Sequence, residues 1–255
     1  MAKFLKRIKL CFRIFCYLLN FAIIKSLDFK SFLKSLESVG LDVFFINIIT
    51  SFFISLVLSL QIVKEFLYLN AVHLVSSILA MSFIRELSPV LTAIIIICKV
   101  GSLFTSEIGT MVVTEQIDSL FILGINPICY LIYPRVLALI LMFPLLNLFS
   151  LFTSFISSAF ICFFLYDISP NFFFINLWYS NILFDLIKSL LKVLIFGLFI
   201  SMISCVWGIT TSGGSRGVGF STTSSVVTSL IAVFILNFFL SYFLFDSLLS
   251  AFSIL

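Results

Sequence analysis

Charged residues are scarce in this chain: Asp, Glu, Lys and Arg make up only 10% of its 255 residues. Soluble globular domains carry about 25% charged residues, so this chain has too little polar surface to cover a soluble core. Hydrophobic residues account for 62% of the chain, and its mean hydropathy is +1.29. The composition excludes a soluble globular protein and predicts an integral membrane protein.

Metal-ligating residues are equally sparse. The chain has one histidine, and its six cysteines are scattered through apolar sequence without a C-x-x-C pair. This spacing excludes an ordinary zinc site and argues against a disulfide framework. We therefore expect no metal, and we expect the cysteines to be buried, reduced thiols (Cys11, Cys16, Cys98, Cys129, Cys162 and Cys205).

Basic residues are concentrated near the start of the chain. Eight of the 15 precede the first long apolar run (Lys3, Lys6, Arg7, Lys9, Arg13, Lys25, Lys30 and Lys34). Basic residues that flank a span stay on the cytoplasmic side, so the N-terminus is expected to face inside. Apolar residues are interleaved with these charges, which favours helices on the membrane surface over a nucleic-acid-binding tail. Residues 1–38 are accordingly predicted to form basic interfacial helices, and no nucleic-acid partner is expected.

An apolar stretch from Ile14 to Ile24 follows basic residues, as the core of a signal peptide does. However, Lys25 comes directly after it and no A-x-A-like cleavage site follows. We therefore expect this stretch to stay on the protein as an interfacial segment.

Long apolar runs mark the expected membrane spans, each of which needs about 20 residues. The run from Ala71 to Phe104 is too long for one crossing, because a helix of that length would measure about 50 Å. Pro89 lacks an N–H and disfavours helix at Ser88, so we expect a kink or break there, with a short outer helix before it. Five spans are predicted, with the chain ends on opposite sides: residues 41–63, 89–107, 136–165, 192–207 and 226–245.

The polar stretch EIGTMVVTEQIDSLFILGINP (107–127) follows the second predicted span and holds three of the chain's 11 acidic residues. Thr114 is a good helix N-cap, Gly124 is placed to end the helix, and Pro127 prevents its resumption. The predicted helix, residues 115–123, is about 13 Å long and too short to span a membrane. Its apolar face consists of Ile117, Leu120 and Phe121. The helix is either a docking element for a soluble partner or a surface helix without one, and spacing alone does not decide.

One long motif contains this helix: RELSPVLTAIIIICKVGSLFTSEIGTMVVTEQIDSLFILGINPICYLIYPRVLA (85–138). A second motif follows later in the chain: GGSRGVGFSTTSSVVTSLI (213–231). They resemble the permeases of lipid-transporting ABC systems of the MlaE type, which occur in bacterial envelopes and plastids. Those permeases carry R-E-L-G-P-V-L, E-L-G-T-M-x-V-T-E-Q-I-D-A-L, P-R-V-L-A and G-G-x-x-G-V-G in the same order. Here Ser88 and Ser119 replace the usual Gly and Ala, and the resemblance covers roughly residues 40–250.

The resemblance implies an all-α permease domain over residues 39–255 that moves phospholipids or related lipids and supplies no chemistry itself. ATP would be hydrolysed by a separate ABC ATPase subunit, so no cofactor is expected in this chain. The short helix would be the coupling helix that inserts into that ATPase, through Glu107, Glu115, Gln116, Ile117, Asp118 and Leu120. A homodimer and an outer-facing MCE-domain lipid-binding protein would complete the assembly. The 34 phenylalanines suit an AT-rich genome, which favours a plastid inner envelope, with a bacterial inner membrane as the alternative.

Ionisable residues inside apolar sequence are costly and usually face a partner or a cavity. Arg85, Glu86 and Lys99 are therefore candidates for the wall of a lipid cavity, where a headgroup needs both charge signs. For Arg85 and Glu86 the alternative is a mutual ion pair or a position at the interface. Glu107 lies about 12 Å along the helix axis from Lys99, so a direct pair between them is not expected.

Two polar regions lie near the last two spans. Asp185 and Lys188 are three positions apart and are expected to form an ion pair at the interface, with Lys192 extending outwards. A Gly-rich stretch precedes the fifth span (Gly213, Gly214, Gly217 and Gly219) and lacks the G-x-x-x-x-G-K-[S/T] pattern of an ATP-binding loop. It is predicted to be a tight inner turn near the ATPase.

The residue chemistry alone leaves two other functions open. An ion-driven secondary transporter would use Lys99, Glu107 and Glu86 as a proton relay, and internal repeats would favour it, but none is visible. A non-transporting membrane scaffold would tolerate reversal of the charge at Lys99.

Overall fold

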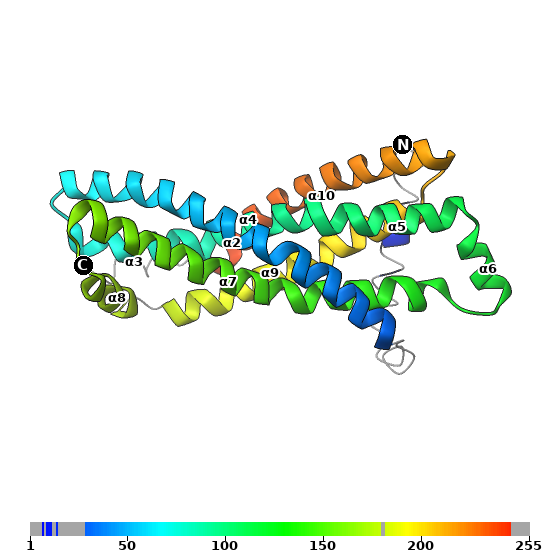
Figure 1. Cartoon of the computed structure of the whole chain (residues 1–255), viewed down its shortest axis with the longest axis horizontal. Coiled ribbons are helices and arrows are strands. Elements are labelled where there is room, and N and C mark those ends of the chain that lie inside the picture. Colours follow the sequence, from blue (N-terminus) through cyan, green and yellow to red (C-terminus); the bar gives the residue numbers. More distant parts are fainter. Residues whose placement is uncertain (1–6, 8, 12–13, 15–28, 180–181, 246–255) are drawn as a thin grey trace. The chain divides into compact units, whose positions relative to one another are not determined.

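The computed structural model describes residues 7, 9–11, 14, 29–179 and 182–245, and every element in these ranges is a helix (Figure 1). Four helices are long: α2 (Phe29–Tyr68), α7 (Tyr133–Tyr166), α9 (Ile182–Ile209) and α10 (Gly214–Phe245). Another continuous helical stretch consists of α3 (Val72–Ser82), the π-helical turn η2 (Phe83–Leu87), α4 (Ser88–Ile96), the π-helical turn η3 (Ile97–Gly101) and α5 (Ser102–Val113). The shorter elements are α6 (Gln116–Ile122), the π-helical turn η4 (Ile128–Ile132) and α8 (Pro170–Tyr179).

Five helical stretches in the described ranges are long and apolar enough to cross a membrane: Lys30–Tyr68, Leu74–Val113, Ile128–Tyr166, Ile182–Ile209 and Gly214–Phe245. The predicted class, an all-α integral membrane protein, is therefore confirmed. The chain forms two compact units. Unit 1 comprises Met1–Val43, Ala93–Phe143 and Leu194–Phe234, and unit 2 comprises Phe44–Thr92, Pro144–Val193 and Ile235–Leu255.

Serine ridges join α2 and α7 in unit 2. Buried polar residues recur at every fourth position of α2 (Asn47, Ser51, Ser55 and Ser59), and α7 presents a matching set (Asn147, Ser150, Ser154, Ser157 and Ser158). The hydroxyls of Ser55 and Ser157 are hydrogen-bonded across the two helices, and the Asn47 side chain donates to the Leu146 carbonyl at 2.8 Å. Small side chains let helix backbones approach closely in a membrane protein. Serine therefore takes the packing role that glycine and alanine often have.

Glycine and threonine give α5 and α9 a close contact in unit 1. Gly208 has no room for a side chain, because an added Cβ would lie 2.7 Å from the Ile108 Cβ. The Thr105 hydroxyl lies 3.0 Å from the Ser204 carbonyl oxygen and 2.9 Å from the Ser225 hydroxyl of α10. α10 itself packs through a narrow stripe of small residues (Val218, Ser221, Ser225, Ser229 and Val233).

The contact at Gly208 makes a testable prediction. Gly208→Ala should lower the free energy of unfolding by about 1–3 kcal/mol, because the new methyl group overpacks the junction of α5 and α9. Gly219→Ala is the matched control, since Gly219 is also helical but an added Cβ meets nothing within 4 Å. That control should be neutral or stabilise by about 0.5–1 kcal/mol. Thermal unfolding of the purified protein in detergent measures both, and equal midpoints would contradict the close packing.

A kink or a break was predicted at Pro89, and the break is wrong because the helical stretch continues through the proline. The chain stays helical from Val72 to Val113, and η2 lies one turn before the proline. In η2 the Ser88 N–H donates to the Phe83 carbonyl five residues back, which is the π-helical pattern. A π-helical turn accommodates proline inside a helix by shifting the hydrogen-bond register locally.

The first long helix also crosses a predicted boundary. α2 runs without interruption through residue 38, where the interfacial segment was expected to end before the first span. Gly40 lies inside this helix, where an added Cβ would be 2.6 Å from the Met142 Cε, so the glycine serves close packing and does not break the helix. Of the predicted interfacial segment Ile14–Ile24 only Ile14 is among the described residues, and four of the eight N-terminal basic residues lie outside them (Lys3, Lys6, Arg13 and Lys25).

Two helices begin earlier than the spans predicted for them. α9 starts at Ile182 and α10 at Gly214, against expected span starts at residues 192 and 226. The charges of α9 and the hydroxyls of α10 suggested polar connections. In α9 the Asp185 carboxylate is paired with Arg85, and in α10 the Thr222 hydroxyl lies 2.7 Å from the Gly219 carbonyl oxygen.

Candidate functional site

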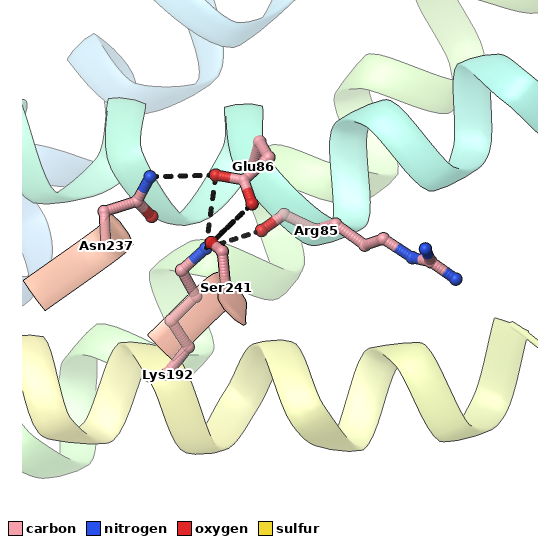
Figure 2. Close-up of polar contacts among 5 residues, drawn as sticks. All are labelled: Arg85, Glu86, Lys192, Asn237 and Ser241. Atoms are coloured by element: carbon pink, nitrogen blue, oxygen red, sulfur yellow. Dashed lines mark hydrogen bonds and ion pairs between the residues drawn. The ribbon is translucent and has the colours of Figure 1, made fainter. Parts of the chain in front are cut away.

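A buried lysine organises the polar centre of unit 2 (Figure 2). Lys192 of α9 has a side chain that is 0% exposed, and its ammonium lies 3.3 Å and 3.4 Å from the two carboxylate oxygens of Glu86. The same ammonium donates to the Ser241 hydroxyl at 2.8 Å and to the Arg85 backbone carbonyl at 2.8 Å. Its charge and its donor capacity are therefore satisfied within this unit.

Pro89 explains why the Arg85 carbonyl is available to Lys192. In a regular helix this oxygen would accept a hydrogen bond from the N–H of the residue four positions later, which is Pro89. Proline has no N–H, so the carbonyl needs another donor inside an apolar environment. The Lys192 ammonium is that donor, and it thereby ties the proline-containing helical stretch to α9.

Glu86 has two further partners on α10. The Asn237 amide donates to one carboxylate oxygen at 2.8 Å, and the Ser241 hydroxyl donates to the other at 2.5 Å. Asn237 and Ser241 are four residues apart, so they lie on one face of α10. We call these four residues the Glu86 cluster: Glu86, Lys192, Asn237 and Ser241. The side chain of Glu86 is still 44% exposed, which leaves its carboxylate accessible to a ligand.

Arg85 belongs to a separate ion pair. Its guanidinium points away from the Glu86 cluster (Figure 2) and binds the Asp185 carboxylate through Nη2 at 2.8 Å and Nε at 2.9 Å. The alternative of a mutual Arg85–Glu86 pair is therefore wrong, and so is the expected pair between Asp185 and Lys188. The outward position expected for Lys192 is also wrong, because its ammonium is fully used by the Glu86 cluster.

Lys99 is an unpaired charge within a candidate span of unit 1. It lies in η3 and is exposed, and its ammonium has no hydrogen bond or ion pair with the described part of the chain. It lines a pocket of about 400 Å³ together with four hydroxyl residues (Ser38, Ser102, Ser106 and Thr222). No carboxylate lines this pocket. The site thus offers one cation and several hydroxyl oxygens to a ligand.

Glu107, in the middle of α5, binds Arg135. The Glu107 carboxylate lies 2.7 Å from the Arg135 Nη2, and the arginine side chain is only 9% exposed. The guanidinium carbon also lies 5.6 Å from the Phe104 ring centroid. The second terminal nitrogen, Nη1, is buried and has no hydrogen-bond partner in the described structure. Glu107 is therefore paired with a residue of α7. It does not lie on the short helix that was expected to insert into the ATPase.

The expected short helix is present as α6, in the connection between α5 and α7 (Figure 1). Its start differs from the prediction, because Thr114 ends α5 and its hydroxyl lies 2.9 Å from the Thr110 carbonyl oxygen. Glu115 occupies the N-cap position with φ +59°, and it makes no capping hydrogen bond. Gly124 ends the helix as predicted, with φ +74° and with the Ile125 N–H donating to the Leu120 carbonyl.

The exposed face of α6 coincides only in part with the apolar face predicted from the sequence. Ile117 packs against the buried core of unit 1, and Ile117 and Leu120 are only partly exposed. Phe121 of the predicted face is exposed, at 61%, and so are two apolar residues outside that face, Ile122 at 87% and Leu123 at 72%. The acidic residues Glu115 and Asp118 are exposed, as expected.

The Gly-rich stretch forms a shorter turn than expected. Only residues 210–213 separate α9 from α10, and Gly213 and Gly214 have φ of +99° and +68°. Gly217 lies in the first turn of α10, where an added Cβ would be 2.1 Å from the Ser212 carbonyl oxygen. Gly219 is also helical. Two of the four glycines therefore make the turn, and a third allows the chain to pass close to it.

Arg7 contacts the same end of α9. Its Nε donates to the Thr210 hydroxyl at 2.9 Å, and its guanidinium lies 3.5 Å from the Trp207 ring centroid. Partial burial lowers the pKa of Arg7 below its ordinary value, and the group stays charged at physiological pH. A basic residue expected at the membrane surface is thus bound to the chain itself.

The family model for the MlaE permease matches residues 32–243, which is most of the chain. The chain belongs to the MlaE permease family. The resemblance on which the sequence interpretation rested is therefore confirmed, and the chain is a membrane permease of the class found in lipid-transporting ABC systems.

Relatives of this permease come from algae, cyanobacteria and plants. It is 42% identical over 245 residues to the "Probable ABC transporter permease protein ycf63" of Pyropia yezoensis, covering 96% of this chain and 92% of that one. It is 44% identical over 206 residues to the "Probable ABC transporter permease protein slr1045" of Synechocystis, covering 81% and 78%. It is 41% identical over 220 residues to the "Protein TRIGALACTOSYLDIACYLGLYCEROL 1, chloroplastic" of Arabidopsis thaliana, covering 86% and 63%.

Sequence reasoning missed several polar residues of the permease. Arg135 stands in the P-R-V-L-A motif, and a charge inside an apolar run next to Glu107 could have identified it as a partner. Asn237 and Ser241 carried no such signal, because a single amide or hydroxyl in an apolar helix is common. Lys192 was noticed, but its role depends on residues more than one hundred positions away.

Proposed function

We propose that this permease moves a phospholipid or related lipid as the transmembrane subunit of an ABC transporter, driven by ATP hydrolysis in a separate ATPase subunit. The observation that carries the proposal is the Lys99 pocket. A lone ammonium inside a candidate span is costly unless it faces water or a ligand. Here it faces hydroxyl residues and no carboxylate, which suits the phosphate of a lipid headgroup.

The exposed end of α6 supports coupling to a soluble ATPase. Phe121 and Ile122 present apolar surface beside the exposed carboxylates of Glu115 and Asp118. A short rigid helix that exposes apolar side chains next to charged ones is suited to dock into a groove of a partner protein. In this proposal, Glu115, Asp118, Phe121 and Ile122 form the contact, while Ile117 and Leu120 hold α6 onto the permease.

The chain itself needs no cofactor in this scheme. ATP is used by the partner, and the permease alternates between two states that differ in affinity for the lipid. Arg85 and Glu86 keep their proposed place near the lipid path. The half-exposed Glu86 carboxylate can meet a cationic headgroup, and Arg85 acts through its pair with Asp185.

The assembly and its location follow the family resemblance and the relatives. We propose a homodimer with an outer-facing MCE-domain lipid-binding protein, as membership of the MlaE permease family implies. The chloroplastic name of the Arabidopsis relative supports a plastid inner envelope, with a bacterial inner membrane as the alternative. The N-terminal basic residues support a stromal or cytoplasmic N-terminus.

A lipid photocrosslinking assay tests the proposal. Lys99→Gln should reduce labelling by a phospholipid photoprobe about tenfold, because it removes a charge-assisted hydrogen bond to the phosphate. Lys99→Arg keeps the charge and should retain most of the labelling. Wild-type labelling of Lys99→Gln, in protein that still couples to ATP hydrolysis, would show that this ammonium does not contact the headgroup.

A further inference from the structure

A larger groove lies beside the Lys99 pocket in unit 1. It has a volume of about 840 Å³ and lies between residues 30–38 of α2, residues 104–111 of α5 and residues 130–135 of η4 and α7. Gln116 of α6 also lines it, so the groove lies at the α6 end of the unit. No part of the proposed function uses this groove.

The lining of the groove is part charged and part apolar, and we call the apolar part its floor. Lys30, Lys34 and Arg135 contribute the cations, while Leu33, Phe104 and Leu131 contribute apolar surface. Two carboxylates, Glu37 and Glu107, also reach the groove, and Glu107 is already paired with Arg135. A soluble anion such as a nucleotide would not use the apolar floor. An amphipathic molecule with a phosphate and an acyl chain matches both parts of the lining.

Arg135 supplies an independent indication of a ligand. Its side chain is more than nine-tenths buried, yet its Nη1 has no hydrogen-bond partner in the described structure. A buried unsatisfied donor on a charged group is costly, and most such donors find a protein, water or ligand partner. Glu107 engages only the other terminal nitrogen. The guanidinium therefore retains capacity to bind a second anion.

The groove and the Lys99 pocket share a wall residue. Ser38 of α2 lines both, with Lys34 one turn before it on the same helix. A headgroup that leaves the groove past Ser38 therefore reaches Lys99 next. The cations Lys34, Arg135 and Lys99 thus mark a path for one anionic group.

We propose that this groove is a lateral port through which a phospholipid passes between the leaflet on the α6 side and the Lys99 pocket. The phosphate is held by Lys34 and Arg135 in the port, and the acyl chains lie against the apolar floor. This inference rests on the proposed lipid transport, and it adds the route and the residues that select a phosphate-bearing headgroup. Zwitterionic phospholipids fit as well as anionic ones, because Glu37 can meet a headgroup amine.

Site-specific photocrosslinking tests the port. The permease, purified with its ATPase, is placed in nanodiscs that contain a phosphatidylcholine probe with a diazirine near the headgroup, and labelled peptides are mapped by mass spectrometry. We expect labels both on residues 30–38 and around Lys99. The double variant Lys30→Glu, Lys34→Glu should reduce both labels about 25-fold, since each basic residue near a membrane surface contributes about a fivefold effect on binding. Lys64→Glu, an exposed lysine at the opposite end of α2, is the matched control and should change neither label.

A second pair of variants tests the passage at Ser38. Ser38→Trp should keep the label on residues 30–38 and lose the label around Lys99, because the indole fills the connection. Phe45→Trp, at an exposed residue of α2 that lines neither the groove nor the Lys99 pocket, is the control and should behave as the unmodified protein. Equal loss of both labels in Ser38→Trp, or of neither, would overturn the route.

Two further experiments identify the ligand. Two patterns of results then distinguish a failure of the proposed port from a failure of the proposed lipid transport. A diacylglycerol probe, which lacks phosphate, should label the groove weakly, and equal labelling would refute headgroup recognition. Millimolar inorganic phosphate should not displace the lipid probe, and displacement would make the groove a site for soluble phosphate. ATP-driven lipid transfer with labelling at Lys99 but none in the groove would reject the port and leave the proposed function standing. Absence of transfer and of both labels would reject the proposed function as well.

Discussion

Lys192→Met should destabilise the permease strongly, by about 3 kcal/mol. Methionine fits the apolar path of the lysine stem but removes the ammonium. The Arg85 carbonyl then loses its replacement donor beside Pro89, and the Glu86 carboxylate loses its ion pair. The loss should lie at the lower end of the range for broken buried pairs, because the Glu86 side chain is 44% exposed and partly solvated. Thermal unfolding in detergent measures the effect.

Two further variants separate this effect from the loss of a positive charge in general. Lys188→Met, one turn earlier on α9, removes a lysine whose ammonium only lies 5.5 Å from the Phe245 ring centroid, so it should cost less than about 1 kcal/mol. Adding Glu86→Gln to Lys192→Met should recover more than half of the loss. The amide can still bond to Ser241 and no uncompensated carboxylate remains. If the double variant is as unstable as Lys192→Met, the whole loss of stability comes from the Arg85 carbonyl.

Much of the fold could be predicted because the membrane imposes a simple rule. Apolar runs long enough to cross must be helical, since backbone groups cannot be left unsatisfied in lipid. The long helices α2, α7, α9 and α10 all coincide with predicted spans in their central parts. Gly124 also marked the end of α6 correctly, because a left-handed residue is needed there.

The ends and irregularities of the helices could not be predicted from local sequence. Charges in α9 were expected to end the span, but Lys192 and Asp185 are neutralised by Glu86 and Arg85, which come from a distant part of the sequence. Proline was expected to kink or break the helix at residue 89, but the helix continues, because η2 and the Lys192 ammonium satisfy the backbone there. Both errors arise because a tertiary partner supplies what the local sequence lacks.

In the candidate site, too, some features follow from the local sequence and others depend on tertiary contacts. Lys99 could be identified from sequence, because a lone charge in an apolar run indicates a cavity whatever surrounds it. The face that α6 presents outwards could not, because it depends on how Ile117 packs against unit 1. Helical spacing correctly grouped Ile117, Leu120 and Phe121 on one side of the helix. It could not tell which of these residues pack against the permease and which stay exposed.

Ile122→Asp should uncouple the permease from its ATPase without unfolding it. Ile122 is 87% exposed, so its replacement costs the isolated permease almost nothing. In the proposed complex the same side chain is buried in the partner's groove, where a carboxylate is strongly disfavoured. We expect co-purification of the ATPase and lipid-stimulated ATP hydrolysis to fall at least about tenfold, with an unchanged unfolding midpoint.

Ile117→Ala gives the opposite pattern and is the matched control on the same helix. Ile117 packs against the unit 1 core, so its truncation should lower the unfolding midpoint by a few degrees. Binding of the ATPase should weaken much less than in Ile122→Asp, because the exposed residues of α6 are unchanged. If Ile117→Ala abolishes ATPase binding while Ile122→Asp does not, the partner contacts the face predicted from sequence and α6 must rotate when it docks. The two isoleucines, five positions apart, therefore distinguish a rigid coupling helix from one that is remodelled by its partner.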